Sequence, residues 1–196
     1  MSTKANKSAS NEEMEKRLEE LENENALLRG NENDFGIRLD QYIEIMSLYP
    51  GKLNLSTESL GRGRSFSFNS FGEIKRILYN DLASILENYR SFMEGGLFYI
   101  MNPKVIRKHG LDDIYAKILN KEMILKIIGT DPKVAVKLYK STTDQQREII
   151  EGMLVQELKT GDPDLNIIAQ ISKLADKDLI KIADESKQLD KLPITA

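Results

Sequence analysis

The stretch FSFNSFGEIKRILYNDLASILENYRSFMEGGLFYIM, residues Phe66–Met101, decides the fold of this chain. Apolar residues alternate with polar ones at its start, recur at helical spacing in its middle and run almost without interruption at its end. Five of the six Phe residues of the chain lie in it, so much of the aromatic core material is here. We expect a strand, a turn, a second strand, a helix and a third strand, which form a small antiparallel or mixed sheet with one covering helix.

The pattern also predicts where each element lies. Ser65–Phe71 and Lys75–Tyr79 are predicted to pair as antiparallel strands around a tight turn at Phe71-Gly72. Asp81–Met93 is predicted to be the helix, because its apolar residues form one broad stripe and Gly95-Gly96 follows it. Leu97–Met101 is predicted to be a strand buried on both faces.

The segment before this stretch carries weaker signals. Asp40–Leu48 fits a capped helix or an alternating strand almost equally well. Tyr49-Pro50-Gly51 is typical of a turn, and Leu53 and Leu55 alternate with polar residues as in a short strand.

Residues 1–34 are predicted to be a polar leader followed by a short coiled-coil helix. Ser10 and Glu13 have the spacing of a capping box at the start of that helix. An a/d seam with steps of 4, 3, 4 and 3 residues follows, formed by Met14, Leu18, Leu21, Asn25 and Leu28. A buried Asn at an a position favours a parallel dimer, so we interpret the seam as an oligomerisation site. The alternative is a solvated amphipathic helix that does not pair, because two heptads are marginal alone.

The remainder of the chain is predicted to be helical. Expected helices are Pro103–Lys108, Leu111–Leu119 and Met123–Ile128. A fourth begins at Asp131-Pro132, and a fifth is capped by Thr142, Thr143 or Asp144 and ends at Gly161. The last is Asp164–Leu189, with a break near Asp176–Asp178. His109, the only His, follows the first of these helices and is predicted to cap its C-terminus, where the dipole favours a cation.

Composition limits the class of protein. The chain has 196 residues, 40% of them hydrophobic, a net charge of −3 and no Cys, which excludes disulfides and thiolate metal sites. No run is apolar enough for a signal peptide or a membrane helix, so we expect a cytoplasmic protein with no membrane partner. The predicted class is α+β, mainly α, with the coiled coil in residues 1–34, a small α+β domain in residues 35–130 and a C-terminal helical bundle in residues 131–196.

One motif suggests nucleic-acid binding. Gly61-Arg62-Gly63-Arg64 places two guanidinium groups directly before Phe66 and Phe68, which lie on one face of a strand. Arginines with alternating aromatic residues can clamp a single strand, and Arg76 could join them. The alternative is that both Phe side chains belong to the core and the arginines form a solvated flank. No phosphate-binding glycine motif is present.

The run NLSTE…GRGRSFSF…FGEIKRILYNDL…NYRSFMEGGLFYIM…VIRKHGL, within residues 40–160, resembles uncharacterised proteins encoded by tailed bacteriophages of Gram-positive hosts. The resemblance implies a virion or infection-associated protein in the host cytoplasm or the virion, with other phage structural proteins as partners. It assigns no functional residues. No constellation of residues indicates catalysis, a metal site or a cofactor. We therefore expect a non-enzymatic, homo-oligomeric structural or adaptor protein, with a nucleic-acid-binding regulator as the alternative.

Overall fold

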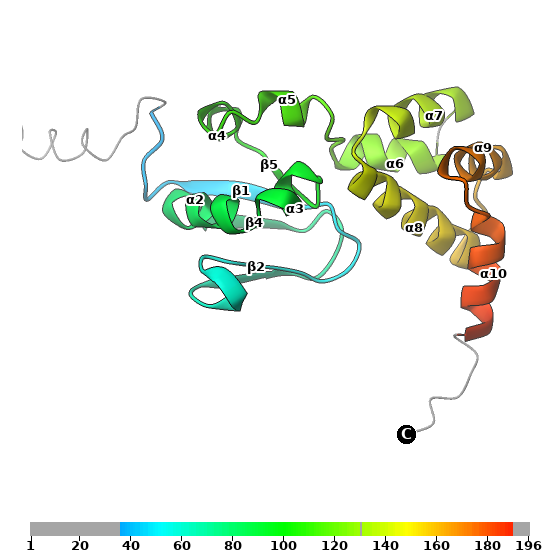
Figure 1. The fold of residues 1–196 in the computed structure, drawn as a ribbon, viewed down its shortest axis with the longest axis horizontal. Helices are drawn as coiled ribbons and strands as arrows, with labels where there is room; N and C mark the ends of the chain where they lie inside the picture. Colours follow the sequence, from blue (N-terminus) through cyan, green and yellow to red (C-terminus); the bar gives the residue numbers. More distant parts are fainter. Residues whose placement is uncertain (1–35, 130, 190–196) are drawn as a thin grey trace, which may run out of the picture.

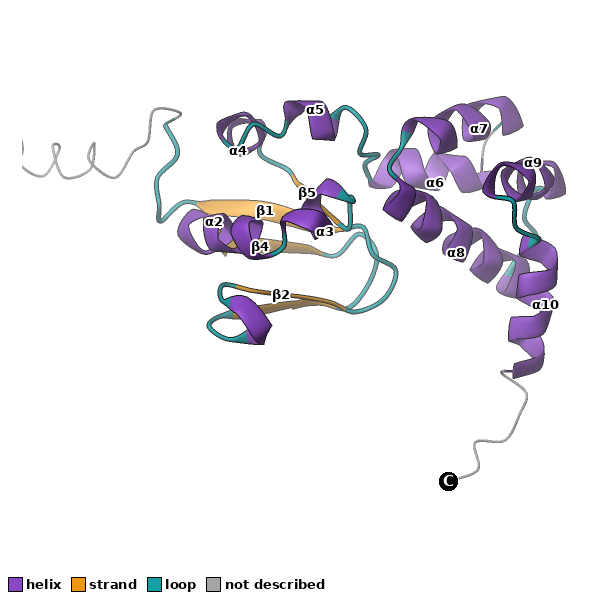
Figure 2. Ribbon diagram, in the orientation of Figure 1, coloured by secondary structure: helices purple, strands orange, loops and turns teal. Residues whose placement is uncertain are grey.

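The computed structural model describes residues 36–129 and 131–189. Within this part the chain forms two lobes: a small antiparallel sheet with short helices around it, and a bundle of longer helices beside it (Figures 1 and 2). This confirms the mixed α+β class expected from the sequence. The predicted coiled coil lies outside the described residues.

A three-stranded antiparallel sheet in the order β4-β1-β5 is the centre of the first lobe. Its strands are β1 (Tyr42–Ser47), β4 (Ile74–Leu78) and β5 (Phe98–Ile100). The ambiguous segment Asp40–Leu48 is therefore largely a strand. Ile43 lies opposite Ile77, and Ile45 lies opposite Ile100, so one face of the sheet is apolar and buried.

The strand pairing differs from the expected hairpin. β2 (Leu53–Ser56) and β3 (Ser65–Phe68) form a separate two-stranded antiparallel sheet, and a short 3-10 turn, η1 (Ser59–Gly61), lies between them. The predicted pairing of Ser65–Phe71 with Lys75–Tyr79 is wrong. The chain leaves β3 and reaches the end of β1, where the Gly72 N–H donates to the Ser47 carbonyl at 2.7 Å and the Ser47 N–H donates to the Glu73 carbonyl at 2.9 Å. The turn at Gly72 thus connects two sheets.

The predicted covering helix is present but divided. α2 (Tyr79–Asn88) begins directly after β4, and α3 (Arg90–Glu94) follows it. The residue between them, Tyr89, leaves helical geometry, and its hydroxyl is 2.7 Å from the Ser56 hydroxyl at the end of β2. α2 buries Leu82, Ile85 and Leu86 in the core that the three-stranded and the two-stranded sheet share.

Two short helices, α4 (Pro103–Lys108) and α5 (Asp112–Tyr115), follow β5. Asn102 caps α4 by accepting from the Lys104 N–H at 2.9 Å, as its position before a proline predicts. α5 is shorter than the predicted Leu111–Leu119.

In β5, Phe98 and Ile100 are fully buried on one face and Tyr99 on the other is half-buried against the core of the helical lobe, so the expected burial on both faces is partly met, while Met101 is exposed. β5 is also an edge strand. The Tyr115 hydroxyl accepts from the Ile100 N–H at 2.8 Å and covers part of that edge.

The second lobe is helical. It contains α6 (Lys121–Gly129), α7 (Pro132–Ser141), α8 (Asp144–Thr160), α9 (Leu165–Ala175) and α10 (Leu179–Leu189). Thr143 caps α8 and Gly161 follows its end, as predicted. Asp176 has a left-handed φ of 54° and separates α9 from α10, which confirms the predicted break.

The two hydrophobic cores meet at one end of the sheet. Met46 of β1 and Leu48 after it belong to the core of the helical lobe, together with Ile124 and Ile127 of α6. α6 therefore packs with the helices that follow it, although it precedes the boundary expected at residue 130. Figure 1 shows α6 and α8 beside this end of the sheet.

Candidate functional site

The junction between the lobes is organised by Gln146 in the first turn of α8, whose side chain is fully buried. Its Oε1 accepts from the Leu119 N–H at 2.8 Å and from the Thr142 hydroxyl. Its Nε2 donates to the carbonyls of Leu119 at 2.9 Å and Gly96 at 3.2 Å. One amide therefore joins α8 to the loop before α6 and to the turn before β5.

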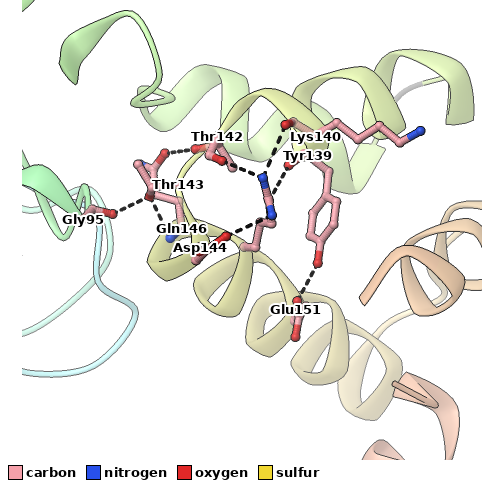
Figure 3. A network of polar contacts seen from close by, with 9 residues as sticks. Gly95, Tyr139, Lys140, Thr142, Thr143, Asp144, Gln146 and Glu151 are labelled. Carbon is pink, nitrogen blue, oxygen red and sulfur yellow. Dashed lines mark hydrogen bonds and ion pairs between the residues drawn. The ribbon is translucent and has the colours of Figure 1, made fainter. Parts of the chain in front are cut away.

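The Gly95-Gly96 turn fits closely around this amide. Gly96 has a φ of +78°, and a Cβ there would lie 2.7 Å from Cδ of Gln146. The Thr143 hydroxyl donates to the Gly95 carbonyl at 2.8 Å, next to the Gln146 bonds (Figure 3). The Gly95-Gly96 turn, which was predicted to end the covering helix, is therefore also where the second lobe forms hydrogen bonds with the first.

A second buried polar contact lies further along α8. The Glu151 carboxylate accepts from the Tyr139 hydroxyl at 2.5 Å and from Lys177 Nζ at 2.7 Å (Figure 3 shows the Tyr139 bond). Burial and this carboxylate together raise the pKa of the Tyr139 phenol, and the same carboxylate raises the pKa of Lys177. Glu151 therefore joins α7, α8 and the turn between α9 and α10.

A cleft of about 710 Å³ lies between the lobes. We call it the junction cleft. One side is the Tyr49-Pro50-Gly51 turn with Leu97, and the other is the face of α8 formed by Gln145, Glu148, Ile149, Gly152 and Gln156. The residues on α8 are spaced 3, 1, 3 and 4 positions apart, which places them on one side of the helix. Its volume is in the range of clefts that bind ligands.

A second groove, of about 540 Å³, lies on the open face of the sheet. Tyr42 of β1 and Met101 contribute apolar surface, and Arg76 of β4 with Lys104 and Arg107 of α4 contribute positive charge. We call it the cationic groove. Among the described residues that line it, Glu44 is the only acidic one, and it lies 3.9 Å from Arg76. Among the described residues, no ion pair involves Lys104 or Arg107.

The residues predicted to bind nucleic acid do not form one surface. Phe68 is fully buried, and the partly buried Phe66 packs against the same core, so the two rings do not form an open stacking surface. Arg64 donates to Asp81 of α2 at 2.8 Å, while Arg62 is exposed in the loop. These positions favour the alternative in which the aromatics are core and the arginines are a flank. Arg76 lies on the other sheet, in the cationic groove.

The predicted oligomerisation residues Met14, Leu18, Leu21, Asn25 and Leu28 lie outside the described residues.

His109 follows α4, and its backbone N–H donates to the Val105 carbonyl at 3.1 Å, which confirms the capping position. The protonated form of the His109 imidazole, which the sequence predicts at this helix end, is not favoured. Burial, with a contribution from Lys108, lowers the pKa of His109, and its Nε2 lies 3.1 Å from the Tyr79 hydroxyl.

Neither Gln146 nor Glu151 was predicted as a site residue from the sequence. The burial of Gln146 could have been predicted, because it falls on the apolar stripe of α8 with Ile149 and Ile150, three and four positions later. A polar residue on a buried stripe requires partners, which indicates a structural contact.

Comparison of the chain with protein-family models, with curated proteins and with solved structures finds no match. Within residues 36–129 and 131–189, no three His, Asp or Glu side chains are placed to hold a metal ion. No helix in the same ranges combines the length and the apolar character needed to cross a bilayer.

Proposed function

We propose that this chain is a non-enzymatic, homo-oligomeric structural or adaptor protein, associated with the virion or its assembly in a tailed bacteriophage. It would act in the host cytoplasm or the virion. The supporting observation is the use of the buried polar groups: Asp81, Gln146 and Glu151 each join separate secondary-structure elements. Gln146 joins the two lobes through the Gly96 carbonyl, while Asp81 and Glu151 each stabilise one lobe, and the outer surfaces remain for partners.

Self-association is assigned to the predicted seam in residues 1–34. Size-exclusion chromatography with light scattering on the full chain should give the mass of a dimer or larger assembly. Leu21→Asp combined with Leu28→Asp should lower that mass, because a carboxylate at a d position must be buried when the helices pair.

A matched control adds the same two charges outside the seam. Asn23→Asp combined with Ala26→Asp occupies outer positions of the predicted heptads and should leave the mass unchanged. A monomeric wild-type chain, or equal masses for both variants, would contradict this proposal.

A second candidate function is nucleic-acid binding, and the cationic groove favours it. Arg76, Lys104 and Arg107 line the same groove as the exposed Tyr42, whose ring lies 5.8 Å from the Arg76 guanidinium. Phosphates would meet the cations, and one base could stack on the Tyr42 ring. The residues that support this candidate are therefore different from those predicted, apart from Arg76.

Fluorescence anisotropy with labelled single-stranded DNA and RNA at two salt concentrations tests this candidate. Binding should weaken as salt rises, and Lys104→Glu with Arg107→Glu should weaken it further. Lys126→Glu with Lys137→Glu makes the same change of charge on α6 and α7, away from the groove, and is the control. Absent or salt-insensitive binding, or equal loss in both double variants, counts against it.

A further inference from the structure

The α8 side of the junction cleft carries polar side chains without hydrogen-bond partners in the described part of the chain. Gln145, Glu148 and Gln156 are exposed, and none of their side chains takes part in a hydrogen bond or ion pair within the described residues. Ile149 between them is buried and, with Leu97 on the other side, makes the cleft partly apolar. The cleft thus combines an apolar surface with unbonded amides and one carboxylate.

Gly152 stands in the middle of this side. Glycine is among the least favourable residues inside a helix, and here close packing does not require it, because a Cβ at Gly152 would have no atom within 4 Å. Its effect is to keep the middle of the cleft open, where any larger side chain would project.

We propose that the junction cleft binds an extended peptide segment of a partner protein that carries Lys or Arg beside an apolar residue. A side-chain amide offers one donor and one acceptor group, which match the N–H and C=O of a peptide main chain. Glu148 pairs with the cationic side chain, and the surface of Leu97 and Ile149 receives the apolar one. Gly152 lets the peptide backbone approach the helix.

The dimensions agree with this occupant. Gln145 and Gln156 are 11 positions apart on α8, about 16 Å along the helix. An extended peptide covers that distance with about five residues. The lining has a carboxylate and no Lys or Arg, so it disfavours phosphate and acidic peptides.

This inference rests on the proposed adaptor function and names the partner chemistry. Random peptides of about 12 residues, displayed on yeast and selected against the full chain, should yield a consensus with Lys or Arg within two positions of an apolar residue.

The affinity of a synthetic peptide with that consensus is then measured by fluorescence anisotropy. Gly152→Leu should weaken its affinity about tenfold or more by filling the cleft. Gly129→Leu, at a glycine with equally open surroundings on α6, should leave affinity unchanged.

The role of Glu148 is tested by a double-mutant cycle. Glu148→Gln should weaken the consensus peptide about fivefold or more, and should have no further effect once the basic residue of the peptide is replaced by Ala. No consensus, an acidic consensus, or full affinity in Gly152→Leu would overturn the proposal. An assembled chain that selects no peptide contradicts the cleft alone, and a monomeric chain that binds the consensus peptide contradicts self-association alone.

Discussion

The polar side chains of α8 are used in two different ways. Gln146 and Glu151 are buried and fully bonded, and they join α8 to the elements around it. Gln145 and Glu148 have the same side-chain types, but they are exposed on the cleft and bond to nothing among the described residues. Burial, and not residue type, therefore separates the side chains that hold the fold from those available to a partner.

The largest effect should come from Gln146→Ala. It removes four hydrogen bonds and leaves buried groups of Leu119, Thr142 and Gly96 without their partner, at a cost of about 3 kcal/mol in unfolding free energy. Urea unfolding monitored by circular dichroism measures it. Gln145→Ala, one residue away, should change stability by less than about 0.5 kcal/mol. Similar losses in both variants would end the distinction between the buried and the exposed polar side chains of α8.

Glu151→Ala should cost about 2 kcal/mol, because the buried Tyr139 hydroxyl loses its acceptor and Lys177 loses its partner. Glu148→Ala on the cleft side is the matched control and should be close to neutral. The same unfolding experiment compares them. If Glu148→Ala proves as costly as Glu151→Ala, the cleft side also contributes to the fold.

Gly152→Ala should raise stability by about 1 kcal/mol, since alanine favours the helix and its methyl group meets no other atom. The reverse is expected at Gly96, where alanine would combine a positive φ with a close approach to Gln146. Thermal unfolding of both variants gives the two signs. A destabilised Gly152→Ala would show that the glycine serves packing after all.

The smallest expected effect is on the pH dependence of stability, and it comes from His109, a half-buried group outside α8. The pKa of His109 is lowered in the folded protein, so the unfolded chain binds its proton more tightly. Stability from this group is present above the ordinary His pKa of about 6.5 and is lost as pH falls toward the folded value. Unfolding at pH 7.5 and 5.5 should show lower stability at pH 5.5.

His109→Gln should reduce this pH dependence. His109 is the only His, and the pKa values of Asp40 and Glu73 are lowered from the usual carboxylate range, so those groups titrate below the window. An equal loss in the variant would place the pH dependence elsewhere.

Local features of the fold were predictable from the sequence, and distant pairings were not. Asn102, Thr143 and Asp176 act within a few residues of their own position, so caps and breaks could be placed from spacing alone. The alternation around Phe66 and Phe68 predicted a strand correctly, but its partner was misassigned to the next strand along the chain. Pairing depends on which distant segment can be buried against it, and alternation carries no information about that.

The candidate sites show the same limit. The Arg62–Arg64 motif was conspicuous in the sequence, yet Arg64 pairs with Asp81 of α2, Phe68 is buried and the partly buried Phe66 packs against the same core. The junction cleft draws on residues about 100 positions apart, Tyr49 and Ile149, and no local motif marks it.

By itself, the sequence determined the α+β class, the ends of most helices and the apolar material of both cores, because these depend on propensity, capping and periodicity over a few residues. Only the tertiary structure decided that β3 and β4 belong to different sheets, that Gln146 joins the lobes and that Gln145 beside it is exposed on the junction cleft. The reason is physical: burial and hydrogen-bond partners are properties of segments brought together in space, and two neighbouring glutamines about 100° apart around a helix meet different surroundings.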